Sequence, residues 1–296
     1  MPQIIASDNH GITVGDIGNF SPEKTFDCGQ CFRYDPVDGG VSGIALGKRV
    51  TIKRIGDCLR IDGITEDEYL NTWQHYLSLD EDYDKIDRMI AEALSPENGG
   101  DVLAAAAKIS EGIRILRQDK WETLCSFIIS QNNNIPRIRK IIDAMSRRWG
   151  ERIGDDDFAF PTAEALADAG EDAIFELRTG FRAKYIADAA KIVAEDKGFL
   201  DSVAGCRDYS DADMMLRRIK GVGPKVSACT LLFGFGRTDA FPIDVWIKRV
   251  IDKYFPCGLD HTVFGNAAGI AQQYLFYYER YMGGDAEKEE GRGKKE

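Results

Sequence analysis

The 296-residue sequence has no long apolar run and no leader-like start. A membrane span needs roughly 18 or more consecutive apolar residues, and no stretch approaches that length. Residues 1–13 lack the basic start and apolar stretch that are typical of a signal peptide. We therefore expect a protein that has no membrane partner. Its expected location is the cytoplasm, at the nucleoid, in a bacterium or archaeon, and the nucleus in a eukaryote.

The cysteines are few and do not form a recognisable framework. Seven of them, an odd number, are scattered through the chain, which does not fit a secreted disulfide scaffold and favours free thiols. Cys28 and Cys31 have the spacing of a metal or redox pair. No second pair lies at the distance typical of zinc sites, and no cysteine-rich run late in the chain could hold an iron–sulfur cluster. We expect no metal and no cofactor.

The bulk composition is ordinary. Hydrophobic residues make up 44% and charged residues 29% of the chain, which argues against disordered, collagen-like and coiled-coil classes. The length predicts two domains, since domains usually contain about 100 to 200 residues. No internal repeat is visible.

A net charge of -11 by itself argues against a nucleic-acid partner, but the acidic residues are concentrated in one segment. Residues 62–101 contain twelve acidic and two basic residues. Residues 137–152 contain six basic and two acidic residues, and residues 214–225 contain four basic residues and no acid. A polyanion could therefore bind these two basic segments without meeting the acidic one. The alternative is that each basic segment is a solvated helix face.

The periodicity of apolar residues changes along the chain from strand-like to helical. Short alternating or β-branched runs at 31–34, 41–46, 49–54 and 58–61, separated by glycine turns, predict a small antiparallel sheet. Helical spacing begins near residue 66, with acidic helices expected at 66–79, 83–94 and 101–110, and two well-marked helices at 121–129 and 136–149. The amide-rich residues 130–134 between the last two predict a loop and helix cap.

The most informative stretch is residues 216–229, LRRIKGVGPKVSAC. A helix that ends at Gly221, a turn with two glycines and a helix that starts at Pro224 predict a helix-hairpin-helix. Glycine allows the chain to approach a phosphate closely, and the free N–H groups at the second helix start can face it. A Gly-x-Gly turn alone is a weak signal, because plain helical connections also contain it.

Asp244 follows nineteen residues after Lys225, at the start of another expected helix. By itself this aspartate would be an N-cap. Hairpin, lysine, helix, loop and aspartate in this order resemble the helix-hairpin-helix DNA glycosylases, in the branch that has both the lysine and the aspartate. Monofunctional relatives keep the aspartate and lack the lysine.

The chain from about residue 27 to residue 282 is similar to the 8-oxoguanine DNA glycosylase/AP lyase family. Four further segments carry the resemblance: 29–33 (GQCFR), 132–137 (NNNIPR), 180–185 (GFRAKY) and 268–276 (AGIAQQYLF). The resemblance implies an α+β fold, with an N-terminal antiparallel β-sheet domain that includes the acidic helices (1–118) and a mostly helical helix-hairpin-helix glycosylase domain (119–282). We expect the tail, 283–296, to be disordered.

The resemblance also assigns the catalytic residues. Lys225 would attack the sugar of a flipped nucleotide, expel the base and form a Schiff base that allows β-elimination, and Asp244 would stabilise the positive charge that develops on the sugar. A lysine is nucleophilic only as the neutral amine, so the site must remove its proton. The alternative for Lys225 is simple phosphate binding. Lys225 and Cys229 are four residues apart, which places the thiol beside the amine.

Base recognition is assigned to a second set of residues. 8-Oxoguanine differs from guanine in carrying a hydrogen on N7, which a backbone carbonyl can detect, and the resemblance gives this role to Gly29. Gln272 would bond the Watson–Crick edge, while Phe276 and Cys229 would lie against the two ring faces. Without the resemblance, Phe276 would be read as ordinary core.

A third set would hold the remaining strand and the backbone. Asn132 would fill the vacated space, Arg137 and Arg182 would read the orphaned cytosine and Phe181 would wedge beside it. Animal members typically have tyrosine at position 181 and histidine at position 246, and a shorter acid at position 279. The role of Glu279 therefore stays open. The residues expected at phosphates are Gly221, Val222, Gly223 and Trp246.

We thus expect a monomeric enzyme that acts on double-stranded DNA containing oxidised guanine. Two alternatives remain: a helix-hairpin-helix DNA glycosylase for another lesion, such as formamidopyrimidine or an alkylated purine, and a noncatalytic DNA-binding protein in which Lys225 touches phosphate.

Overall fold

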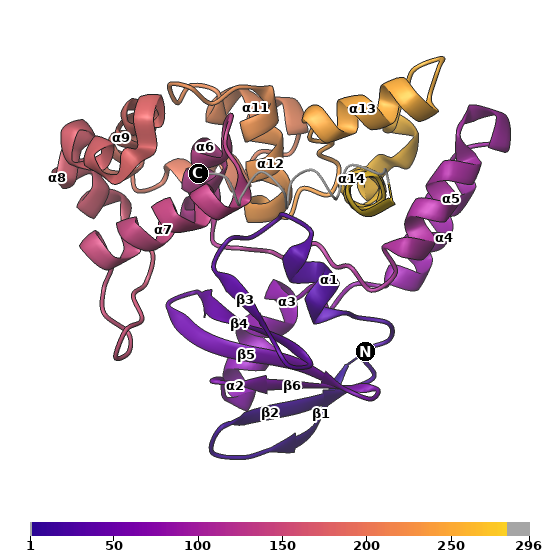
Figure 1. Ribbon diagram of the computed structural model, residues 1–296, viewed down its shortest axis with the longest axis horizontal. Coiled ribbons are helices and arrows are strands. Elements are labelled where there is room, and N and C mark those ends of the chain that lie inside the picture. Colours follow the sequence, from indigo (N-terminus) through magenta and orange to yellow (C-terminus); the bar gives the residue numbers. More distant parts are fainter. Residues whose placement is uncertain (1, 283–296) are drawn as a thin grey trace, which may run out of the picture.

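In the computed structural model, which describes residues 2–282, a single sheet lies below a broad layer of helices (Figure 1). The described strands are β1 (Gln3–Ser7), β2 (Gly11–Gly15), β3 (Tyr34–Val37), β4 (Gly40–Ala45), β5 (Lys48–Ile55) and β6 (Cys58–Asp62). Their order across the sheet is β1-β2-β6-β5-β4-β3, and every neighbouring pair is antiparallel. The expected α+β class, a sheet followed by helices, is confirmed.

The sheet differs from the prediction at its two ends. The pair β1 and β2 was missed, because each is only five residues long and lies between polar or glycine residues. The strand expected at 31–34 is wrong: β3 begins only at Tyr34. The preceding backbone leaves the sheet because the buried amide of Gln30 donates hydrogen bonds to the carbonyls of Thr25 (2.8 Å) and Arg114 (2.8 Å).

The expected acidic helices are present with small differences. The first is interrupted, with helical turns α2 (Glu66–Glu68) and α3 (Gln74–Tyr76) on either side of a π-helical turn, Tyr69–Trp73. The next two are α4 (Tyr83–Glu92) and α5 (Gly100–Ile109). The short helix α1 (Pro22–Asp27) connects β2 to β3, and a 3-10 turn, Pro96–Asn98, precedes α5.

The helical layer continues from Lys120 to Met282. Its α-helices are α6 (Lys120–Ser130), α7 (Ile135–Trp149), α8 (Ala163–Ile174), α9 (Ala183–Glu195), α10 (Phe199–Ala204), α11 (Tyr209–Leu216), α12 (Pro224–Phe235), α13 (Val245–Tyr254) and α14 (Ala268–Met282). A π-helical turn, Phe175–Thr179, and 3-10 turns, Gly180–Arg182 and His261–Ala267, complete it. The expected helices at 121–129 and 136–149 correspond to α6 and α7.

The molecule has two hydrophobic cores. One packs against the sheet and is built from strand residues such as Ile52 and Ile61, together with Tyr69 and Trp73 from the first acidic helix. The other fills the helical layer and includes Ile90 of α4 and Leu103 of α5. Residues 83–109 thus pack with the helical layer, beside α14, rather than with the sheet. The division of the chain at residues 118 and 119 stays a prediction.

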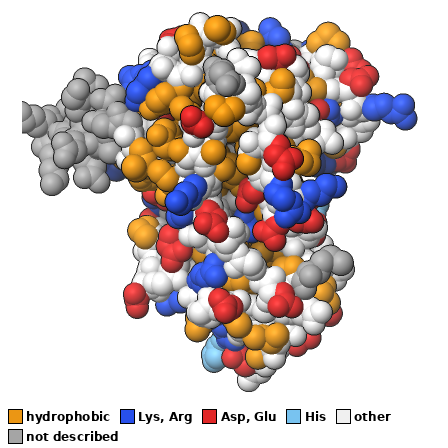
Figure 2. All heavy atoms as spheres, turned by 90° about the vertical axis from the view of Figure 1, so that its right-hand side faces the viewer, with side chains coloured by type: hydrophobic (Ala, Val, Ile, Leu, Met, Phe, Trp, Pro, Cys, Tyr) orange, Lys and Arg blue, Asp and Glu red, His pale blue; other side chains and the backbone are white. Residues whose placement is uncertain are grey.

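The acidic and basic segments lie apart. The acidic helix α4 is at one side of the helical layer, while α7 and the turn before α12 are toward the other side and the centre (Figure 1). On the face that is turned toward the viewer in Figure 2, acidic and basic side chains are interspersed. No helix among residues 2–282 is long and apolar enough to cross a membrane. The expected disordered tail, 283–296, lies outside the described residues.

Candidate active site

Lys225 is held between two helices that pack against each other. It lies in the first turn of α12, and α6 runs beside α12 in the centre of the helical layer (Figure 1). The Lys225 Nζ donates a hydrogen bond to the Ser130 Oγ at 3.2 Å and lies 5.0 Å from the centre of the Phe127 ring. The amine is therefore partly buried and in contact with an aromatic face, which attracts a cation.

Cys229 lies within electrostatic range of both Lys225 and Asp244. Cys229 is one helical turn after Lys225 and buried. Burial raises the pKa of the Cys229 thiol to about 11, the Lys225 amine opposes this shift and the Asp244 carboxylate adds to it. The thiol therefore interacts electrostatically with both the lysine and the aspartate, while the catalytic roles of Lys225 and Asp244 stay predictions.

The side chain of Asp244 is fixed by the helix that follows it. Its Oδ1 accepts a hydrogen bond from the Ile247 N–H at 2.9 Å, so the aspartate is the N-cap of α13. The cap holds the carboxylate at the positive end of the helix dipole. The expected N-cap role of Asp244 is therefore confirmed, and its catalytic role beside Lys225 stays a prediction.

Gln272 and Phe276 form a second part of the site on α14. Gln272 is 4% exposed, and its side-chain oxygen Oε1 is buried without a hydrogen-bond partner among the described residues. A buried unpaired amide oxygen is costly, so such an atom indicates a place for a donor from a ligand. Phe276, one turn later, lies 6.4 Å from Trp246 between ring centres, in an edge-on arrangement.

Gly29 faces the same aromatic side chain. A methyl group added to Gly29 would lie 3.6 Å from the Phe276 ring, and the glycine has a φ of 82°, which side chains rarely adopt. The structure therefore brings together Gly29, Phe276 and Trp246 from three distant parts of the sequence. Trp246 also stacks with Arg249, whose guanidinium lies 5.1 Å from its ring.

The residues expected at the orphaned base lie around one loop. Asn132 is exposed and has a φ of 47°. Arg182 is only 3% exposed and donates to the carbonyls of Gln131 and Asn132, the latter at 2.7 Å. Burial lowers the pKa of Arg182, and the nearby Arg137 lowers it further.

Arg182 is thus occupied with shaping the Asn132 loop in this structure, so reading of a cytosine by Arg182 stays a prediction. Phe181 is 46% exposed, its ring centre lies 4.5 Å from the Arg182 guanidinium, and its role as a wedge stays a prediction. Arg137 is exposed and donates to the Arg178 carbonyl at 3.0 Å.

The predicted hairpin is present, but its first helix is shorter than expected. α11 ends at Leu216, not at Gly221, and irregular turns span residues 217–223. The ring of Tyr185 packs so closely on Gly221 that a methyl group there would lie 2.3 Å from it. Gly223 is the N-cap of α12 and has open space on its Cβ side, and Val222 between them is buried.

Three contacts were not found from the sequence. Ser130 and Phe127 contact Lys225, and only their helical spacing just before the Asn132 loop could have indicated them. Glu279, left open above, is 5% exposed and pairs with Lys253 at 3.3 Å, which joins α14 to α13.

The thiols of Cys28 and Cys31 are free, and burial raises the pKa of Cys28 to about 12 and that of Cys31 well above its ordinary value. Within residues 2–282, no group of three or more potential ligands is arranged to hold a metal ion.

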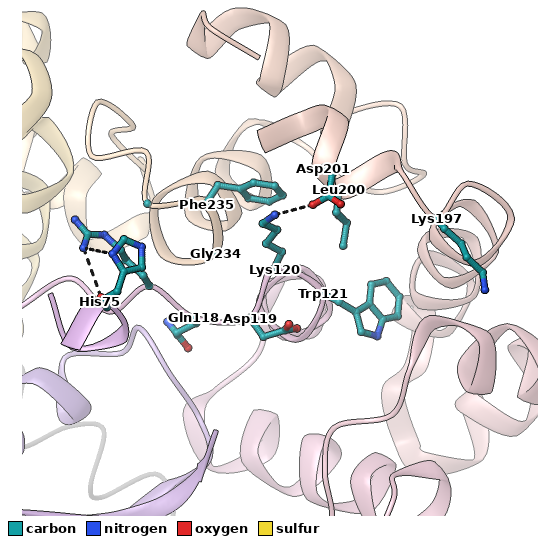
Figure 3. Close-up of a pocket in the computed structure, with 12 residues that line it drawn as sticks. His75, Gln118, Asp119, Lys120, Trp121, Lys197, Leu200, Asp201, Gly234 and Phe235 are labelled. Atoms are coloured by element: carbon teal, nitrogen blue, oxygen red, sulfur yellow. Dashed lines mark hydrogen bonds and ion pairs between the residues drawn. The ribbon is translucent and has the colours of Figure 1, made fainter. Parts of the chain in front are cut away.

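A cavity of about 780 Å³ opens at the other end of the α6 and α12 pair. Figure 3 shows Lys120, Trp121 and Phe235 around it, with Lys120 paired to Asp201 at 2.9 Å. None of the predicted site residues lines this cavity. The cavity therefore lies apart from the predicted site residues, and its size alone does not assign it a function.

Comparisons with known proteins match nearly the whole chain. Residues 14–124 match the family model described as 8-oxoguanine DNA glycosylase, N-terminal domain. Residues 125–262 match the model described as HhH-GPD superfamily base excision DNA repair protein.

Two solved structures are similar over almost their full length. The structure of MBOgg1 in complex with a low-affinity DNA ligand is 38% identical, with a TM-score of 0.87 over 96% of this chain and 99% of that chain. The 8-oxoguanine glycosylase/lyase of Clostridium acetobutylicum, in complex with double-stranded DNA containing cytosine opposite 8-oxoG, is 35% identical, with a TM-score of 0.85 over 95% of this chain and 97% of that chain.

Curated relatives are matched over a smaller part of their length. The N-glycosylase/DNA lyase of Saccharomyces cerevisiae is 38% identical over 50% of this chain and 44% of its own. The probable N-glycosylase/DNA lyase of Methanothermobacter thermautotrophicus is 31% identical over 59% of this chain and 65% of its own. The alignments thus span less than two thirds of these relatives.

Proposed function

This chain belongs to the 8-oxoguanine DNA glycosylase family of helix-hairpin-helix proteins, and from that premise we propose that it excises 8-oxoguanine from double-stranded DNA and then cleaves the strand. The observations that support this most directly are the electrostatic contact of Cys229 with both Lys225 and Asp244, and the buried unpaired oxygen of Gln272 on α14. The proposed substrate is chromosomal DNA, which places the enzyme in the cytoplasm of a bacterium or archaeon, or in the nucleus of a eukaryote.

In the proposed first step, the neutral Lys225 amine attacks C1′ of the flipped nucleotide. The new C1′–N bond replaces the bond to the purine, which leaves with the bonding electrons and takes up a proton. In this proposal, the Asp244 carboxylate stabilises the positive charge that develops on the sugar. The hydroxyl of Ser130 and the ring of Phe127 hold the Nζ in place.

In the second step, ring opening of the sugar gives a protonated imine on Lys225. Loss of the C2′ hydrogen as a proton sends its electrons toward the imine and expels the 3′-phosphate, which breaks the strand. Hydrolysis of the imine returns the free amine. The two proposed steps use only groups of the protein, the DNA and water as reactants.

The proposed base pocket uses the unpaired atoms of the structure. The Watson–Crick edge of the lesion carries N–H donors that could satisfy the Gln272 Oε1. The N7 hydrogen of 8-oxoguanine would bond the Gly29 carbonyl, whereas guanine presents a lone pair there. One hydrogen bond of this kind contributes about 1 to 3 kcal/mol of discrimination.

Borohydride trapping tests the covalent step. Reduction of the imine should link the wild-type protein to a duplex that contains 8-oxoguanine, and the Lys225→Gln variant should bind the duplex without forming the link. A wild-type protein that binds but never links would instead support a noncatalytic DNA-binding role. Comparison with duplexes that contain formamidopyrimidine or an alkylated purine then tests the lesion class. Faster excision of either base would favour the alternative, a glycosylase for a lesion other than 8-oxoguanine.

A further inference from the structure

Two consecutive backbone carbonyls before Gly29 are held by one helix. The Gln273 Nε2 donates to the Cys28 carbonyl at 2.7 Å, and the Arg280 Nη1 donates to the Asp27 carbonyl at 3.2 Å. Both donors lie on α14. Within residues 2–282, no donor reaches the next carbonyl, that of Gly29. The helix thus holds the two peptide groups that precede Gly29 and leaves the Gly29 carbonyl available to another donor.

Gln273 is the stronger of these two contacts. Its side chain is 2% exposed, and the hydrogen bond is shorter than that of the half-buried Arg280. A buried hydrogen bond to a backbone carbonyl restricts the peptide plane, because its loss leaves the carbonyl unpaired. Rotation of the Cys28–Gly29 peptide would also redirect the carbonyl that follows, since Gly29 has no side chain to restrain its dihedral angles.

The neighbouring residues Gln272 and Gln273 on α14 therefore have different contacts. The side chain of Gln272 ends in the unpaired oxygen, while the side chain of Gln273 ends on the Gly29 loop. Because Gln272 and Gln273 are neighbours on α14, the backbone of this helix links the Gln272 side chain to the loop that carries the Gly29 carbonyl, and these are the two groups proposed to contact the base. We propose that Gln273 is a positioning residue for lesion specificity, which orients the Gly29 carbonyl toward N7. This inference rests on the proposed function.

The Gln273→Met variant removes the donor at similar side-chain volume. We expect the ratio of excision rates for 8-oxoguanine and guanine to fall about five- to tenfold, as loss of one aligned hydrogen bond predicts. Cleavage at a preformed abasic site involves no base and should fall less than twofold. A purely structural role for Gln273 would lower both activities together.

The Gln273→Glu variant adds a readout that depends on pH. A protonated carboxyl can donate to the Cys28 carbonyl, whereas a carboxylate repels it. We expect this variant to approach wild-type selectivity at about pH 6 and to lose it as the pH rises to about 8, relative to wild type at each pH. Gln273→Met should show no such relative change. If Gln273→Met folds poorly, this pH dependence remains a test.

Gln118→Met is the matched control. Gln118 donates a hydrogen bond of the same length, 2.7 Å, to the Gln30 carbonyl on the other side of Gly29. Gln30 is also anchored by its own amide, so the loss of Gln118 should change selectivity less than twofold. Full selectivity in Gln273→Met, or a pH-independent Gln273→Glu, would overturn the inference. A wild type that does not excise 8-oxoguanine would instead refute the proposed function.

Discussion

At the scale of the residue, the side-chain oxygen of Gln272 is the most informative single atom, because it is buried without a hydrogen-bond partner among the described residues. A buried amide oxygen without a partner destabilises the folded protein, typically by about 1 to 3 kcal/mol. Proteins retain such groups where they are needed for function. The sequence predicts the role of Gln272 only through resemblance. The structure adds a physical reason to place a ligand donor there.

The Gln272→Met variant should therefore separate stability from activity. It removes the unpaired oxygen at similar volume, so the free energy of unfolding should stay equal or rise by up to about 1 kcal/mol. Excision of 8-oxoguanine should fall about tenfold or more, with a smaller loss in cleavage of a preformed abasic site. Urea denaturation and single-turnover assays check the two parts. Equal losses in both activities would contradict the assigned contact with the base.

Arg182 shows what residue-level prediction could not supply. The sequence identifies an arginine next to an aromatic wedge and assigns it to the opposite base. In the structure its guanidinium is buried and holds the carbonyls of Gln131 and Asn132. Long-range contacts of this kind join residues about fifty positions apart, so neither local spacing nor charge reveals them.

At the scale of the element, the hairpin before α12 depends on two glycines for different reasons. Gly221 has a φ of 82° and lies against the Tyr185 ring, so both its backbone and its surroundings require glycine. Gly223 has a φ of −94° and open space around it. The fold itself therefore requires glycine at position 221, whereas nothing in the fold requires it at position 223, where we expect a DNA phosphate to approach.

Alanine variants at these two positions make a matched pair. Gly221→Ala should lower the free energy of unfolding by about 2 to 3 kcal/mol, through backbone strain and the contact with Tyr185. Gly223→Ala should leave stability within about 1 kcal/mol but weaken binding to duplex DNA, because the added methyl lies where the backbone of DNA would approach. Thermal denaturation and a salt-dependent binding assay measure the two effects. Unchanged DNA affinity in Gly223→Ala would argue against phosphate binding at this turn.

At the scale of the whole molecule, the sequence predicts the order of sheet and helices and most helix positions. Strong 3.6-residue spacing fixes α6 and α7, and glycine turns fix the hairpins of β4, β5 and β6. The segment 31–34 is predicted as a strand because its residue types favour one, but β3 begins only at Tyr34. The true shape of this segment is set by the buried Gln30 amide, which bonds Thr25 and Arg114 across the fold.

The candidate site was likewise predictable in part. The candidates Lys225 and Asp244 follow from motif order, and only one helix and a loop separate them in the sequence. The contacts of Ser130 and Gln273 could not be predicted, because they depend on how α6 and α14 pack against distant segments. Sequence patterns thus suggest the candidate reacting groups, while tertiary packing determines which residues contact them.

The junction between the sheet and the helical layer leads to a prediction about pH. Glu122 of α6 forms an ion pair with Arg33, at 3.5 Å, from the segment before β3. Burial raises the pKa of Glu122 to about 7, and Arg33 only partly opposes this shift. The unfolded value is about 4.3, so between these values the folded protein retains a proton that the unfolded chain releases.

This difference destabilises the fold as the pH rises. The free energy of unfolding should decrease from about pH 4.5 to pH 7 through Glu122, and the loss should be complete above the folded pKa. Glu122→Gln cannot ionise, so its stability relative to wild type should increase between about pH 5 and pH 8. Because the Glu122 side chain is 22% exposed, solvent reduces the effect, and we expect about 1 to 2 kcal/mol. Urea denaturation of both proteins across this range measures it, and parallel curves would mean that Arg33 fully compensates the buried charge.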